Sequence, residues 1–147
     1  DCLLSRGLGD VYKRQIIYSP LQMAADLIEN YEGHPAFRFF RDFDADCDWS
    51  KALQGEIGDY IVVARRAKDR YFLGAGTDEK ARTLVQKLDF LEPGVTYTAT
   101  IYADAPDAGR NPEAYLIGKR AVTARDTIRI EMAERGGQAI TFIPAEK

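Results

Sequence analysis

From Trp49 onward, apolar and polar residues alternate with a period of two, and turn-forming residues recur about every ten positions. The clearest case is Val95–Ala103, whose two faces carry, respectively, Val95, Tyr97, Ala99 and Ile101, and Thr96, Thr98, Thr100 and Tyr102. Side chains alternate between the two faces of a strand, so this segment has one apolar and one threonine-rich face. The threonine face suits an open sheet, and the whole region predicts antiparallel strands.

The remaining strands are expected at Ala52–Ile57, Tyr60–Arg66, Tyr71–Thr77, Arg82–Phe90, Ala114–Val122, Thr127–Met132 and Gln138–Ile143. Tyr60–Ala64 is apolar throughout, which favours a strand covered on both faces. About eight short strands separated by turns are typical of a sandwich. The predicted fold class is therefore mainly β, an antiparallel, Greek-key-like β-sandwich.

One corner of this sandwich has a specific signature. Pro93 and Gly94 form a turn signal, and Tyr97 follows at the start of the next strand. This spacing resembles a tyrosine corner, in which the phenol bonds to the backbone a few residues upstream. We interpret Pro93, Gly94 and Tyr97 as a structural corner and not as a catalytic site.

A single helix is expected before the strands. Ser19 can cap its N-terminus, with Pro20 at the first helical position, and Gly33 can end it. Its apolar stripe, at helical spacing, consists of Leu21, Ala24, Leu27, Ile28 and Tyr31. A stripe of this width must be buried against another element, so we predict that it marks an interface with a domain absent from this chain.

The segments around this helix complete the predicted organisation. Residues 1–15 have no clear period and end in VYKRQ, which resembles translated adapter sequence at the ends of metagenomic fragments. We treat them as a non-native or disordered leader. Residues 16–43 hold the helix and a phenylalanine-rich connector, which is expected to be buried, and residues 44–147 form the β-domain.

Composition excludes some functional classes. The formal net charge is -3, with charges of both signs spread along the chain, whereas duplex nucleic-acid binders usually show a clustered basic face. No run of residues is long and apolar enough to span a bilayer. Cys2 and Cys47 have no metal-type spacing. We predict no nucleic-acid or membrane partner.

The candidate chemical residues are few. His34, the sole histidine, follows the helix stop and has no nucleophile nearby in sequence, so a role at the helix C-terminus is favoured. Asp42–Asp48 begins like a calcium loop, but Cys47 stands where glycine is needed and Leu53 where glutamate should close the shell. No catalytic, metal-binding or ligand-binding residue is therefore predicted.

Several segments, in order, resemble the C-terminal end of glycoside hydrolase family 97 enzymes, which include bacterial α-glucosidases and α-galactosidases. They are SPLQMAADLIENY, GEIGDYIVVARR, TDEKARTL, LDFLEPGVTYTATIY and NPEAY. The resemblance implies an N-terminal sandwich, a (β/α)8 barrel and a C-terminal β-domain, so that the helix would be the last of the barrel. Two departures are Ile28, where the family often has proline, and the acidic Asp42–Asp48 connector.

The resemblance also implies the parent's chemistry, which is hydrolysis of terminal α-glycosidic bonds in oligosaccharides, in the periplasm or outside the cell. Catalytic carboxylates and calcium would lie upstream, so this chain alone is expected to be an inactive fragment. Its expected role is structural, in packing on the barrel and in homo-oligomer contacts. Two alternatives remain open: a carbohydrate-binding module that uses Trp49 or the tyrosines, and a fibronectin-like interaction domain.

Overall fold

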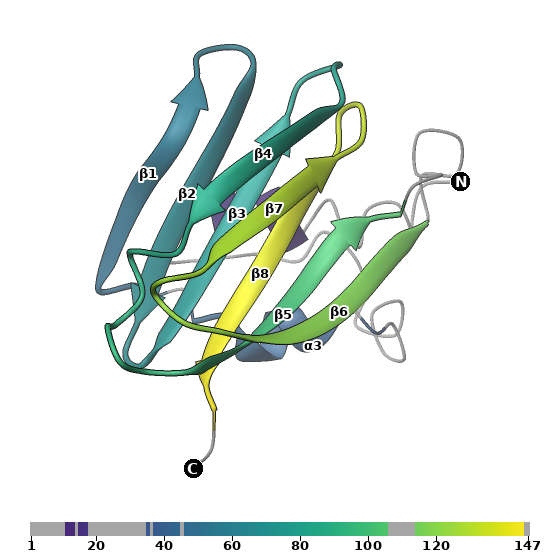
Figure 1. Cartoon of the computed structure of the whole chain (residues 1–147). Helices are drawn as coiled ribbons and strands as arrows, with labels where there is room; N and C mark the ends of the chain where they lie inside the picture. The colour runs from purple at the N-terminus through teal and green to yellow at the C-terminus, as the bar shows by residue number, and fades with distance from the viewer. Residues whose placement is uncertain are drawn as a thin grey trace.

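The computed structural model describes residues 11–13, 15–17, 35, 37–44, 46–105 and 114–145. Its elements are α3 (Phe37–Asp42), β1 (Trp49–Glu56), β2 (Tyr60–Ala67), β3 (Arg70–Thr77), β4 (Arg82–Lys87), β5 (Tyr97–Asp104), β6 (Tyr115–Val122), β7 (Thr127–Met132) and β8 (Gly137–Pro144) (Figure 1). No helix among the described residues has the length and apolar character that crossing a bilayer requires.

The strands form two sheets of unequal size. The larger one has the order β1-β2-β3-β8-β5-β6, and the smaller one pairs β4 with β7. Every pair is antiparallel. Since β8 lies between β3 and β5, the connections cross in the Greek-key manner. The predicted mainly β, antiparallel sandwich is confirmed.

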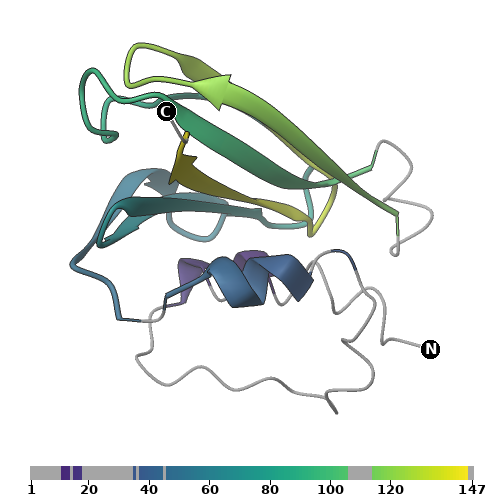
Figure 2. The ribbon, with the colours of Figure 1, turned by 90° about the horizontal axis from the view of Figure 1, so that it is seen from below.

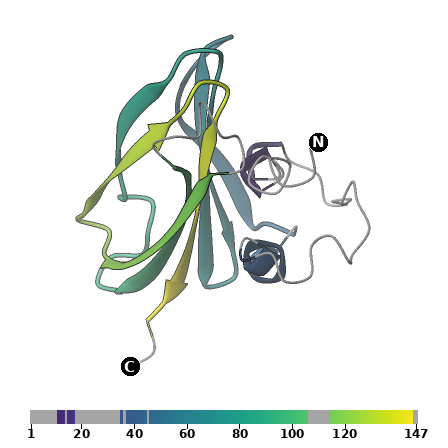
Figure 3. The same cartoon turned by 90° about the vertical axis from the view of Figure 1, so that its right-hand side faces the viewer.

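Three layers stack in this domain. The β4–β7 pair covers one face of the six-stranded sheet, here called the inner face, and the helical segments cover the opposite, outer face (Figures 2 and 3). The inner core is mainly aliphatic with a few aromatic rings, and its fully or almost fully buried members include Leu73, Tyr97, Ile130, Ile140 and Phe142. Alternation along each strand sends these side chains to the inner face, as the period of two predicts.

The outer core is built around α3. Phe39 is fully buried and its ring stacks on Phe43, with centroids 5.5 Å apart. The same ring meets Phe72 of β3 and Tyr102 of β5 edge to face, at 6.4 and 5.6 Å. Such aromatic contacts add to the area that the rings bury. The phenylalanine-rich connector therefore forms a short helix that packs on part of the outer face through the buried Phe39.

A second helical segment, residues 11–13 and 15–17, lies on the same face. Val11 and Gln15 are fully buried, and the Ile17 N–H bonds to the Lys13 carbonyl at 2.7 Å. Gly74 allows this close approach, since a Cβ built there would lie 2.5 Å from Cγ of Gln15. Part of the predicted leader thus packs on the sheet, whereas residues 1–10 lie outside the described residues. That residues 1–15 are non-native stays a prediction.

The covered outer face corrects one expectation. The threonine face of β5 was expected to suit an open sheet, yet Thr100 is only 7% exposed and Tyr102 1% exposed. The reason is the helical layer, because Tyr102 packs in the cluster that Phe39 and Phe72 form. The sequence of β5 correctly predicts which side chains share a face. It does not predict which element covers the second face.

Candidate functional site

The predicted barrel interface cannot be placed. Leu21, Ala24, Leu27, Ile28 and Tyr31 lie outside the described residues, as does His34. The interface role of these five residues stays a prediction. The other predicted residues, those of the corner, are described.

The corner begins with a tight turn. The Val95 N–H donates to the Glu92 carbonyl at 3.4 Å, with Pro93 and Gly94 at the two central positions. Gly94 has a φ of 83°, a conformation that glycine adopts at no steric cost. Proline followed by glycine is typical of a type II turn. This turn leads the chain directly into β5.

Tyr97 is buried just beyond that turn, with 1% of its surface exposed. Its ring meets Tyr71 edge to face at 5.6 Å. Burial raises the pKa of Tyr97 to about 12, with the neighbouring Tyr71 and the Glu92 charge as further causes, while a hydrogen bond with the Glu92 backbone acts in the opposite direction. A phenol with this pKa keeps its proton at neutral pH, so its contacts stabilise the core and do not poise an acid or base.

The acidic connector stabilises the β2–β3 turn. Asp44 accepts a hydrogen bond from Nζ of Lys68 at 3.0 Å, and this bond holds the pKa of Asp44 below its usual value. Asp48 accepts one from the Lys68 backbone N–H at 2.8 Å, and Asp42 pairs with Arg38 at 3.4 Å. Since the carboxylates of Asp42, Asp44 and Asp48 are each bonded to a donor of the protein, they do not converge as calcium ligands would. Among the described residues, no group of three His, Cys, Asp or Glu side chains could hold a metal ion.

Trp49 packs into the sandwich. It is half-buried against the inner core, and its ring meets Tyr71 edge to face at 6.2 Å. A sugar-stacking platform needs an open ring face, whereas this ring packs on the core. The geometry therefore gives no support to the carbohydrate-binding alternative at Trp49.

A polar junction that the sequence reading missed surrounds Arg82, at the start of β4. Its guanidinium donates to the Asp59 carboxylate at 2.9 Å and to the Asp59 carbonyl at 3.0 Å, and also pairs with Asp78. The hydrogen bond from Arg82 lowers the pKa of Asp78. The Asp78 carbonyl in turn accepts from the Arg135 N–H at 2.6 Å. The junction thus joins the β1–β2 turn, the end of β3, the start of β4 and the β7–β8 turn.

Only part of this junction had a sequence signal. Asp78 and Arg82 are four residues apart, an ordinary spacing for an ion pair. Asp59 is twenty-three positions from Arg82, so its part depends on the tertiary fold. With both carboxylates paired to one arginine, the arrangement fastens two sheets together.

Asp104 was also missed, because it reads as an ordinary loop residue. It is half-buried at the end of β5 and accepts hydrogen bonds from the N–H groups of Ala133 and Gly137, at 3.2 and 3.0 Å. Burial raises the pKa of this carboxyl, although both hydrogen bonds act in the opposite direction. Asp104 therefore anchors the β7–β8 turn to β5.

The described residues contain no poised nucleophile. Cys47 donates its S–H to the Asp44 carbonyl at 3.3 Å, and burial raises the pKa of the thiol. A raised pKa keeps the thiol protonated and unreactive. The described polar groups therefore hold turns and sheets together.

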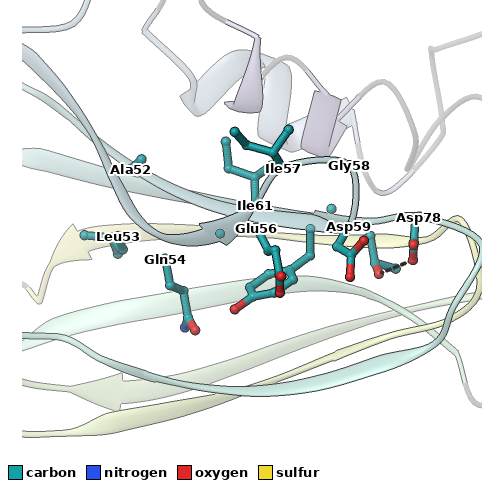
Figure 4. Close-up of a pocket in the computed structure, with 13 residues that line it drawn as sticks. Ala52, Leu53, Gln54, Glu56, Ile57, Gly58, Asp59, Ile61 and Asp78 are labelled. Atoms are coloured by element: carbon teal, nitrogen blue, oxygen red, sulfur yellow. Dashed lines mark hydrogen bonds between the residues drawn. The ribbon is translucent and has the colours of Figure 1, made fainter.

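An open hollow at the surface has room for a partner. It lies at the β1–β2 hairpin and has a volume of about 680 Å³. Its lining includes Ile57 and Ile61, whose side chains point toward the helical side of the sheet, whereas the side chain of Glu56 points to the opposite side (Figure 4). This hollow suits a packing contact better than a reaction, because Asp59 and Asp78 beside it are paired with Arg82.

Comparison with known proteins identifies the family to which this chain belongs. Residues 46–143 match the family model described as glycosyl-hydrolase 97 C-terminal, oligomerisation. A retaining α-galactosidase from Bacteroides thetaiotaomicron is 30% identical over 126 residues, which are 85% of this chain and 19% of that protein. The chain thus spans about a fifth of this relative.

Solved structures agree. A glycoside hydrolase family 97 enzyme from Pseudoalteromonas sp. strain K8, in complex with acarbose, has a TM-score of 0.86 and 41% identity, over 97% of this chain and 22% of that one. A β-arabinopyranosidase has a TM-score of 0.69 over 94% of this chain and 20% of that one, and at 19% identity it supports the fold alone. The chain therefore belongs to glycoside hydrolase family 97, and residues 46–143 are its C-terminal, oligomerisation domain.

Proposed function

We propose that this chain is the non-catalytic C-terminal part of a secreted or periplasmic α-glycosidase that hydrolyses terminal α-glycosidic bonds. The carrying observation is the extent of the match, since almost the whole chain corresponds to 22% of the Pseudoalteromonas enzyme. The α-galactosidase named above favours an α-linked substrate. Catalytic carboxylates and the calcium that the resemblance implies would be supplied by the remainder of the parent.

The proposed role of this part is mechanical. The ion pairs of Arg82 connect the two sheets, and Asp104 holds the β7–β8 turn to β5. Helix α3 packs on part of the outer face. These contacts make a stable domain that can cover a neighbouring barrel and contribute to oligomer contacts. Oligomerisation is the role that the matched family description names.

The test begins with the upstream genomic sequence and expression of the complete parent. We expect the parent to hydrolyse nitrophenyl α-glucoside or α-galactoside, and the 147-residue chain to hydrolyse neither. Turnover by this chain alone would contradict the non-catalytic role. A parent that acts on neither substrate would contradict the proposed activity, and cell fractionation of the parent checks its location.

A further inference from the structure

The outer face of the large sheet carries one row of residues with almost no side chains. Gly55 of β1 pairs with Ile61 of β2, Ile61 pairs with Gly76 of β3, and Gly76 pairs with Gly137 of β8. Directly paired residues of antiparallel strands project to the same face. Ile61 is therefore the one large side chain in this row, which crosses four strands.

Half of this row is already occupied by the helical layer. A Cβ built on Gly137 would lie 2.6 Å from the Tyr12 ring, and one built on Gly76 would lie 3.0 Å from Cδ1 of Ile16. The helical segment of residues 11–13 and 15–17 thus lies directly on the β3 and β8 part of the row. Glycines at these positions let a covering segment approach the sheet backbone closely.

The other half of the row is open. Ile61 is 37% exposed, and Ile57 in the hairpin turn has its whole side chain in solvent. Both isoleucines point toward the helical side of the sheet (Figure 4). Together with Gly55 they line the hollow already described, and we name these three residues the hairpin patch. Exposed β-branched side chains around an apolar hollow are typical of a surface that a partner covers.

The position of this patch indicates which partner covers it. The described helical segments that precede the strands, residues 11–13 and 15–17 and α3, lie on this outer face (Figures 2 and 3). The matched relatives are about four and a half times as long as this chain, and the matched family model is a C-terminal one. The preceding domain of the parent would therefore meet the sheet on the face where the patch is open.

We propose that the hairpin patch is a docking site for an apolar helix of the catalytic domain, which would lie beside residues 11–13 and 15–17 along the same row. This inference rests on the proposed function, which supplies the preceding domain. The open space over Gly55 selects a helix with small or aliphatic residues on the side that faces this glycine.

The experiment compares charge substitutions at the two edges of the same sheet. The test variant is Ile57→Asp/Ile61→Asp, and the matched control is Leu116→Asp/Ile117→Asp on β6, where exposure is 55% and 39%. Each double variant is made in the complete parent and in the 147-residue chain, and the thermal midpoints of all four proteins are measured. Because both positions are exposed in this chain, either variant should change its midpoint only slightly.

In the parent, we expect the patch variant to lower the midpoint by about 4 °C more than the control does, because a charge would be buried at the domain contact. Equal effects of the patch variant in the parent and in the chain would overturn the proposal. A second copy of the chain is the other candidate occupant. If the patch variant instead converted a dimer of the isolated chain into a monomer in sedimentation, the domain-docking proposal would also be overturned.

This outcome is separable from the proposed function. A parent that hydrolyses α-glycosides but shows no specific loss in the patch variant keeps its activity assignment and loses only the docking site. A parent with a patch-specific loss but no hydrolysis keeps the docking site and loses only the activity.

Discussion

The two faces of the six-stranded sheet are built differently. The inner face is filled by large side chains such as Leu73, Ile140 and Phe142, which pack against the β4–β7 pair. The outer face alternates large rings such as Phe72 with the bare positions Gly74 and Gly137, and helical segments lie on it. The inner face thus supplies its own cover from strands within the domain. The outer face is shaped to receive a layer that comes from outside the β-domain.

The two faces also differ in how well their buried polar groups are hydrogen-bonded. Gln15, Tyr102 and Thr141 each have buried polar side-chain atoms without a hydrogen-bond partner, and all three belong to the interface between the sheet and the helical layer. Buried polar groups without partners are costly, so this interface holds more loosely than the inner core. The comparison therefore predicts that truncating a side chain on the inner face destabilises the whole domain. Truncating one on the outer face should only release the helical segments from the sheet.

The largest expected effect comes from Phe142→Ala on the inner face. Phe142 is fully buried, and its truncation should cost about 3 to 5 kcal/mol in the free energy of unfolding. Its counterpart on the outer face is Phe39→Ala, expected to cost about 2 kcal/mol or less because α3 can open locally. Denaturant unfolding measures both, and hydrogen exchange should show faster exchange in α3 alone for Phe39→Ala. Equal costs with loss of protection in every strand would break the comparison.

The glycine row offers a second contrast. Gly137→Ala should cost about 1 to 3 kcal/mol, because its Cβ would lie 2.6 Å from the Ala75 carbonyl as well as from the Tyr12 ring. Gly118 on β6 has open space around its Cβ position, so Gly118→Ala should leave stability unchanged or raise it by up to about 1 kcal/mol. Unfolding curves of the two variants decide the matter. A neutral Gly137→Ala would show that the row does not need glycine.

Asp104 gives a pH-dependent prediction. Burial raises its pKa above the ordinary 3.8, so the folded state binds the proton more tightly than the unfolded state does. Its contribution to stability is then fully present below pH 3.8 and is lost as the pH rises through the folded pKa. The difference in free energy of unfolding between the wild type and Asp104→Asn should therefore shift toward the variant as the pH rises. A shift in the opposite direction would mean that the two backbone N–H bonds outweigh burial.

The smallest expected effect is that of Tyr97→Phe. The variant keeps the ring in the inner core and loses only the hydroxyl contacts with the Glu92 backbone and Tyr71, which should cost about 1 kcal/mol. The midpoint of denaturant unfolding measures this loss. No change would argue against the predicted tyrosine corner, whereas Tyr97→Ala serves as a control that should cost several times more.

The inner face was predictable because its information is local. Alternation along β5 and β7 identified their buried residues, and the observed β7 (Thr127–Met132) has the predicted bounds. Other strands differ by one to three residues at their ends, where turns decide the boundary. β1 begins at Trp49, three residues before the predicted Ala52, and contains a bulge between Ala52 and Gln54 that alternation alone does not show.

The outer face and the polar contacts were not predictable in the same way. Nothing in the period of β5 states that α3 covers Tyr102, because that contact joins segments about sixty residues apart. The Arg82 junction and the Asp104 anchor likewise depend on which strands become neighbours. The family resemblance was available from the sequence, because it depends on ordered segments such as residues 55–66 and 88–102, and it is confirmed.

The most direct test of this account compares amide hydrogen exchange in the 147-residue chain and in the complete parent. Strands that face the β4–β7 pair should exchange at the same slow rate in both proteins, since their cover lies within the domain. The β1–β2 hairpin, residues 53–62, should exchange markedly more slowly in the parent, because the preceding domain covers it there. Equal exchange of the hairpin in the two proteins would contradict an outer face that receives its cover from the rest of the enzyme.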